Sequence, residues 1–409
     1  MDYICGQIYD GEIRHACIGI EDGKIAEIRK TAPPMARIRD YGDAIILPAA
    51  IDIHVHFREP GSIYKEDFFT GSRAAAIAGV TCVMDMPNNK PAILSAEKFN
   101  EKARIVAKKA CVDYGLYAGV NKEGYECDCA GYKTFLSADN EIFCSPDWME
   151  RLLIFIKKVD KPLAIHAEIE DCIERKKAEN LREHGRRRRK ECEIEGIKKI
   201  LEINEKIGAK VHFCHVTLGE AVDLIGNRAS FGSTLHHLLF STESRFTYEA
   251  MGKTNPPLRE ERERRKLYEM FQQGRIPILE SDHAPHLIEE KEEFESAPSG
   301  MPGVDAMLPI MLDMVRDGKV EMEAMLNMMG RNPAKLFGLN KGAVETGRDA
   351  DLIIVDFSVE HKIKPLSKCG WSAYEGMKCI YPMDVYLRGE RIVESHEFIG
   401  KGGMGRMIT

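Results

Sequence analysis

Four histidines and one aspartate that could bind a divalent metal lie at the ends of apolar stretches in the chain. His54 and His56 lie two residues apart in the segment IDIHVHFREPG, so in a strand both imidazoles point to the same side. His166, His215 and Asp282 each end another apolar segment. Nitrogen and oxygen ligands without thiolates favour zinc, and manganese, cobalt or iron would accept the same set. An HxH pair alone is common in strands, but the five residues together predict a metal site.

Lys133 lies in the middle of an apolar segment, GYKTFLS, where an ammonium group is costly to bury. Two interpretations stay open. The side chain could reach the rim of the fold, where water solvates it. Alternatively, the amine could add carbon dioxide and become an anion whose two oxygens bridge metal ions about 3.5–4 Å apart. His212, three residues before His215, would face the other way in a strand, so we interpret it as a packing residue.

Eight apolar, β-branched segments recur along the middle of the chain, and helix-like patterns separate most of them. They span residues 45–56, 79–87, 112–120, 131–137, 161–168, 209–217, 229–241 and 276–285. Near-continuous apolar strands that alternate with helices are typical of a parallel sheet covered on its outer face, and eight of them fit a closed barrel. We therefore predict an α/β fold, a (β/α)₈ TIM-type barrel, with the candidate ligands at the C-terminal ends of its strands.

Both ends of the chain have a different pattern, of short strands with Gly or Asp at the turns. We predict a small β-sandwich domain built from both termini. The predicted division is residues 1–48 for its N-terminal part, 49–342 for the metal-dependent barrel, and 343–409 for its C-terminal part and tail.

Composition argues against a nucleic-acid or membrane partner and for a small-molecule substrate. The chain has 65 acidic and 58 basic residues, a net charge of -7, and no apolar stretch long enough to span a bilayer. The start lacks the features of a signal peptide, so we expect a cytoplasmic protein. The segment REHGRRRRK contains the basic run Arg186–Lys190, but it stands alone without interleaved aromatics, and we interpret it as a solvated face.

The twelve cysteines are scattered through the chain. Their spacing indicates neither a disulfide framework nor a CxxC-type zinc site. We interpret most of them as reduced, buried small hydrophobes.

A series of motifs resembles the dihydroorotase branch of the amidohydrolase superfamily over nearly the whole chain. In order, they are HVHFREPG, MPNNKP, GYKTFLS, IHAE, CHVT, NPPLR, SDHAPH, SGMPG and NPAKLFGL. The resemblance implies a (β/α)₈ barrel with a small β-sandwich and two zinc ions per subunit. It assigns His54, His56 and Asp282 to one ion, His166 and His215 to the other, and carboxylated Lys133 as the bridge between them. One large subgroup of the branch lacks this lysine; the present chain resembles the lysine-containing kind.

Substrate choice rests on other residues, above all Arg58 and Asn88. Arg58 stands two residues after His56, and its guanidinium could bind the carboxylate that dihydroorotate has and that hydantoin and allantoin lack. By resemblance, Asn255, His286 and Gly303 match positions that contact the substrate. A plain turn role remains an alternative for Asn255 and Gly303.

The implied activity is reversible hydrolysis of (S)-dihydroorotate to N-carbamoyl-L-aspartate in pyrimidine biosynthesis, by a hydroxide between two metal ions with Asp282 as general acid and base. The alternatives are an allantoinase, a hydantoinase or dihydropyrimidinase, and, more remotely, a non-catalytic scaffold. The sequence leaves open whether the chain works alone, as a homo-oligomer, or together with aspartate carbamoyltransferase.

Overall fold

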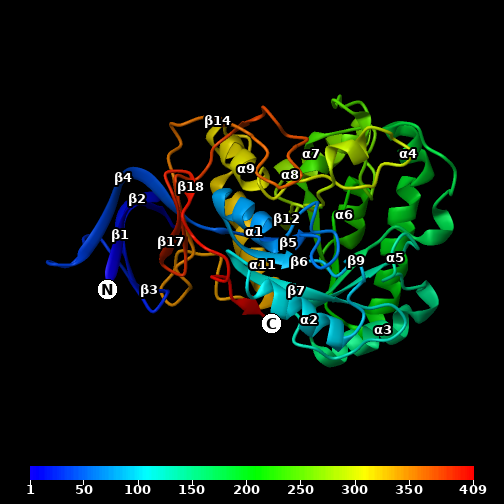
Figure 1. Ribbon diagram of the computed structural model, residues 1–409, viewed down its shortest axis with the longest axis horizontal. Helices are drawn as coiled ribbons and strands as arrows, with labels where there is room; N and C mark the ends of the chain where they lie inside the picture. Colours follow the sequence, from blue (N-terminus) through cyan, green and yellow to red (C-terminus); the bar gives the residue numbers. More distant parts are fainter.

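A parallel barrel forms the centre of the molecule in the computed structural model, which describes all 409 residues (Figure 1). Neighbouring strands follow the order of the chain from β5 to β12. The strands are β5 (Ala50–Val55), β6 (Val80–Asp85), β7 (Asp113–Gly119), β8 (Gly131–Phe135), β9 (Leu163–His166), β10 (Val211–Phe213), β11 (Ser230–Thr234) and β12 (Ile278–Glu280). The barrel closes where Val55 bridges His283 in parallel. One strand lies in each predicted apolar segment, and the barrel fold is confirmed.

Helices cover the outside of the barrel because their apolar residues recur every three or four positions. In α3, for example, Met149, Leu152 and Ile156 are buried, and the Ser145 side chain caps the first turn. The helices are α1 (Phe68–Ile77), α2 (Ala96–Val106), α3 (Pro146–Val159), α4 (Leu181–Arg187), α5 (Lys190–Ile207), α6 (Gly219–Ile225), α7 (Leu235–Leu239), α8 (Glu261–Gln272), α9 (Met307–Arg316), α10 (Met322–Leu326) and α11 (Asn332–Phe337). Single turns are η1 (Glu170–Cys172), η2 (Glu249–Gly252), η3 (Ile288–Lys291) and η4 (Asn327–Arg331). None of these helices combines the length and the apolar character needed to cross a bilayer.

Strands from both termini form a second sheet, which is mixed and lies beside the barrel (Figure 1). Its order is β18-β17-β16-β13-β4-β1-β2-β3, so β4 joins the N-terminal to the C-terminal strands. The strands are β1 (Asp2–Tyr9), β2 (Ile13–Glu21), β3 (Lys24–Arg29), β4 (Arg37–Pro48), β13 (Leu352–Val355), β16 (Asp384–Leu387), β17 (Glu390–Glu394) and β18 (Glu397–Phe398). A small β unit built from both termini is therefore confirmed, while the boundaries at 48/49 and 342/343 stay a prediction.

Two C-terminal pieces lie outside this sheet. β14 (His361–Lys362) and β15 (Lys378–Cys379) pair with each other, and β19 (Met407–Ile408) pairs in parallel with β7 of the barrel. The C-terminal tail thus returns to the barrel instead of ending in the small sheet.

Four of the twelve cysteines form two disulfides that their spacing did not indicate. Cys5 of β1 is bonded to Cys17 of β2, and Cys172 of η1 is bonded to Cys192 of α5. Antiparallel pairing places Cys5 directly opposite Cys17, a register that spacing along the chain could not reveal. The other eight cysteines are free, and all but one of them are buried, as expected.

Candidate metal centre

Three predicted ligands meet at the C-terminal mouth of the barrel, where β12 lies next to β5. His54 lies within β5, His56 directly follows it, and Asp282 follows β12. Asp282 Oδ1 lies 3.1 Å from His56 Nε2 and 3.3 Å from His54 Nε2. All three residues are buried, and one ligand atom from each lies within 4.8 Å of the others. These separations suit a single cation held between them.

His166 and His215 complete the cluster from the neighbouring strands. His166 Nδ1 lies 3.2 Å from His215 Nε2, and the centroid of the His215 ring lies 5.2 Å from that of His54. His215 Nδ1 is buried and has no hydrogen-bond partner. A buried imidazole nitrogen without a partner is costly, so this donor set fits a bound metal better than a packed core.

Lys133 of β8 is fully buried beside this cluster. Its Nζ lies 3.1 Å from Cys214 Sγ and 4.8 Å from the centre of the Phe135 ring, with no carboxylate oxygen within 4 Å. The lysine does not reach the solvated rim, which removes that interpretation. A buried ammonium group without a carboxylate partner is costly, so this environment disfavours the charged amine.

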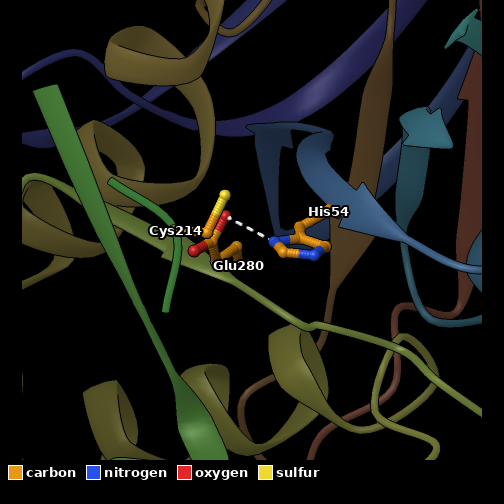
Figure 2. A group of neighbouring side chains, drawn as sticks. All are labelled: His54, Cys214 and Glu280. Atoms are coloured by element: carbon orange, nitrogen blue, oxygen red, sulfur yellow. Dashed lines mark hydrogen bonds and ion pairs between the residues drawn. The ribbon is translucent and has the colours of Figure 1, made fainter. Parts of the chain in front are cut away.

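Two further potential ligands were not predicted, Cys214 and Glu280. Both lie within reach of His54, and Figure 2 shows the His54 ring turned toward the Glu280 carboxylate with the Cys214 sulfur beside it. His54 Nδ1 lies 3.3 Å from Glu280 Oε2. Glu280 could have been found from its place two residues before Asp282, whereas Cys214 carries no signal beyond its adjacency to His215.

Ion pairs behind the metal centre hold His166 in place. His166 Nε2 lies 2.8 Å from Glu168, whose carboxylate accepts hydrogen bonds from Arg188 at 2.9 Å. Arg188 also pairs with Asp139 at 2.6 Å and is only 4% exposed. The solvated-face interpretation of the basic run is therefore wrong for Arg188, because a buried carboxylate draws this one arginine inward.

Burial and charge set the protonation of the ligands in the metal-free site. Burial lowers the pKa of His56 to about 3 and, together with the charge of His166, lowers the pKa of His215 well below its usual value. Burial opposes protonation of His54, but Asp282, Cys214 and Glu280 raise its pKa to about 10. The same histidines hold the pKa of Asp282 well below its usual range, against the effect of burial. Without a metal, the centre therefore combines an ionised Asp282 with neutral His56 and His215 and a protonated His54, which must release its proton when a metal binds.

A cavity of about 270 Å³ opens above these ligands and contains three of the predicted substrate residues, Arg58, Asn88 and Asn255. Arg58 is half-buried, its Nη2 lies 3.0 Å from His286 Nε2, and no carboxylate lies within 4 Å of it. Asn88 Oδ1 accepts a hydrogen bond from His56 Nδ1 at 2.7 Å. That bond leaves His56 Nε2 free to face the metal position.

The remaining predicted substrate residues differ in their placement. His286 lines an adjoining cavity of about 260 Å³ that shares Arg58 and Asn88 with the first and has no carboxylate in its wall. Gly303 lines neither cavity; its N–H donates to His283 Nδ1 at 3.1 Å. Within the same SGMPG motif, Gly300 is the glycine that lines the main cavity.

Comparison with known proteins identifies the family of the chain. The pattern of the amidohydrolase family matches residues 45–383. A dihydroorotase of Methanosarcina acetivorans is 34% identical over 98% of this chain and 93% of its own, and one of Thermoplasma acidophilum is 36% identical over 97% and 95%. Among solved structures, an L-hydantoinase (dihydropyrimidinase) of Arthrobacter aurescens aligns with a TM-score of 0.93 and 26% identity over the full length of both chains. The chain therefore belongs to the amidohydrolase family, as a cyclic amidohydrolase whose full-length relatives include dihydroorotases.

Proposed function

We propose that this enzyme is a dihydroorotase, which reversibly hydrolyses (S)-dihydroorotate to N-carbamoyl-L-aspartate in pyrimidine biosynthesis. The observation that carries the proposal is Arg58, a half-buried guanidinium beside the metal centre without a carboxylate partner of its own. Such a cation calls for an anion from the substrate. Dihydroorotate brings a carboxylate to this place, whereas hydantoin and allantoin do not.

We also propose that the residues that converge at the barrel mouth bind two zinc ions. His54, His56 and Asp282 would hold one ion, His166 and His215 the other, and carboxylated Lys133 would bridge them. When bound, divalent cations supply a water activated at neutral pH and polarise the ring carbonyl. Two observations support this arrangement: His215 Nδ1 is buried without a hydrogen-bond partner, and Lys133 is buried without a carboxylate partner.

The protein's own residues would orient the substrate and move the proton. Arg58 and Asn88 would bind the substrate carboxylate from one side of the cavity, with His286 beside them and Asn255 on the wall. Asp282 would take the proton of the attacking water and pass it to the departing ring nitrogen, and the reverse transfer would serve ring closure. We expect ring closure to be favoured at acidic pH, where the carboxylate of carbamoyl-aspartate is more easily protonated.

A substrate comparison tests the assignment. The purified enzyme, loaded with zinc, should open dihydroorotate faster than hydantoin or allantoin. Arg58→Gln should raise KM for dihydroorotate by about 10-fold or more while the bound metal stays unchanged, because one charge-assisted contact is lost. Faster opening of hydantoin or allantoin by the natural chain would show that the enzyme is a hydantoinase or allantoinase. The structural similarity to an L-hydantoinase, with a TM-score of 0.93, is the reason to test this alternative.

The bridge requires a separate test. Metal analysis should find about two ions per chain, and incubation with isotopically labelled carbon dioxide should give a carbamate signal that Lys133→Arg abolishes. Full metal content without a carbamate signal would contradict the proposed role of Lys133. Less than one ion per chain would revive the scaffold alternative.

A further inference from the structure

A third cavity, of about 340 Å³, lies on the outside of the barrel between α4, the start of α5 and the start of α8. Figure 1 shows α4 in the upper right and α8 near the upper middle. Six of the eleven lining residues are Arg or Lys and two are Glu, although the chain as a whole has a net charge of -7. The six are Arg182, Arg186, Arg189, Lys190, Arg259 and Arg262. This cavity therefore concentrates positive charge on a chain that is acidic overall.

Some of these cations have no carboxylate partner, whereas other arginines nearby do. On α8, Arg264 and Arg265 pair with Glu261 at 2.7 and 2.9 Å. Arg186 and Arg262, which line the cavity, have no carboxylate oxygen within 4 Å, and both are exposed. Their charges are thus available to a ligand.

The wall of the cavity is buried and carries a polar group without a partner. Thr242 Oγ1 is buried and makes no hydrogen bond. Beside it, Arg259 is only 7% exposed, and three contacts fix its guanidinium: Glu193 at 3.0 Å, Thr217 Oγ1 at 2.8 Å and the Arg188 carbonyl at 2.7 Å. The fixed guanidinium of Arg259 gives the cavity a rigid wall, which a merely solvated basic face would not have.

We propose that this cavity binds a small anion with several negative charges, of the diphosphate or triphosphate class. Guanidinium groups bind phosphate oxygens in pairs, and the unpaired Arg186 and Arg262 supply two of them. No aromatic side chain lines the cavity, so it lacks the stacking surface that single-stranded nucleic acid uses. The inference does not depend on the reaction proposed for the metal centre.

Isothermal titration with inorganic triphosphate tests the proposal on the full-length enzyme. The natural chain should bind at one saturable site, and Arg186→Gln with Arg262→Gln should weaken binding by about tenfold or more, because two charge-assisted contacts are lost. The matched control is Lys199→Gln with Arg265→Gln, which removes the same charge from exposed positions of α5 and α8 outside the cavity. This control should bind like the natural chain, and so should Arg58→Gln, which tests the basic cavity near the metal centre.

Several results would overturn the proposal: no saturable binding by the natural chain, equal weakening in the control pair, or loss of binding in Arg58→Gln. Both double variants change exposed side chains and should melt within a few degrees of the natural chain, so weak binding cannot be blamed on unfolding. A single-stranded oligonucleotide that binds more tightly than triphosphate, with affinity that falls steeply as salt rises, would overturn the small-anion assignment in favour of nucleic acid.

Discussion

Arg188 never reaches the substrate cavity, yet the metal centre depends on it. It supplies the charge partner of Glu168, a fully buried carboxylate that contacts His166. Arg188→Gln should lower the free energy of unfolding by about 3–5 kcal/mol, because Glu168 is left buried without a cation. It should also weaken metal binding about 10–100-fold, because His166 loses its outer support. Urea unfolding and competition with a chelator measure the two effects.

Arg189→Gln is the matched control, because Arg189 is the next residue but is exposed. The free energy of unfolding and the metal affinity of Arg189→Gln should equal those of the natural chain within experimental error. An Arg188→Gln variant that retained metal as well as this control would show that Glu168 does not depend on the ion pair.

Asp139, the second partner of Arg188, gives the ion-pair cluster a dependence on pH. Burial raises the pKa of Asp139, but Arg188 and Arg175 outweigh it and lower the pKa from 3.8 to about 2. A depressed carboxyl pKa stabilises the fold above the unfolded value, and the contribution disappears as pH falls from about 4 to about 2. Asp139→Asn should therefore cost on the order of 1 kcal/mol at neutral pH, because solvent screens a side chain that is 27% exposed.

Urea unfolding across this pH range measures the effect. The difference in the free energy of unfolding between Asp139→Asn and the natural chain should shrink toward zero as the pH approaches about 2. A difference that stayed constant with pH would contradict the ion-pair origin of the effect.

The residues that sequence could identify are those whose role follows from position on a strand. His54 and His56 share a side because strand side chains alternate, and Asp282 ends a strand that a barrel must bring to the same mouth. Arg188 could not be identified, because nothing in a basic run indicates which arginine a distant carboxylate will bury. For a similar reason the sequence predicted Gly303 at the cavity wall, where the structure has Gly300. Loop geometry decides which backbone faces the cavity, and the sequence does not show it.

At the scale of elements, a C-terminal segment holds the loop that carries His286. Between β14 and β15, Trp371 donates its indole N–H to the His286 carbonyl at 2.7 Å. In the same segment, the Lys368 N–H donates to the buried carboxylate of Glu66 at 3.1 Å. The substrate loop of the barrel is thus positioned by chain that lies some eighty residues further on.

Trp371→Phe should raise KM for dihydroorotate about 2–10-fold and leave metal content unchanged, because it removes one hydrogen bond from the His286 loop. Steady-state kinetics with metal analysis measures this. The chain's other tryptophan, Trp148 on α3, offers the control, and Trp148→Phe should leave KM unchanged. Equal KM values for the two variants would show that Trp371 does not position the loop.

The elements of the barrel were predictable because buried parallel strands are continuous apolar runs, even where the strand is as short as β10 or β12. The pairing of β19 with β7 was not, since a two-residue strand leaves no periodic signal. The Cys5–Cys17 bond was missed for a related reason: it depends on the register between two strands, and register is a property of the assembled sheet.

At the scale of the whole molecule, one buried lysine joins the barrel to the small sheet. Lys341 is 4% exposed, and its Nζ lies 2.8 Å from Asp113 of β7 and 2.7 Å from Asp351, which directly precedes β13. Burial disfavours its charge, but Asp351 and Asp113 raise the pKa of Lys341 above its usual 10.5. A raised lysine pKa stabilises the fold fully below 10.5, and this stability is lost as pH rises through the folded value.

Lys341→Met should therefore cost about 3–5 kcal/mol at neutral pH, because Asp113 and Asp351 keep their burial but lose their shared cation. Burial already raises the pKa of Asp351, so without Lys341 this carboxyl should be protonated more readily as pH falls. The deficit of the variant should consequently shrink in acid and grow toward neutral pH, whereas the contribution of the Lys341 charge in the natural chain should be lost only at strongly alkaline pH. Urea unfolding over this pH range measures both trends, with Lys335→Met on the exposed side of α11 as the control. A loss of stability in Lys341→Met that did not vary with pH would contradict this account. It would mean that the lysine joins the two parts of the molecule by packing and not by its charge.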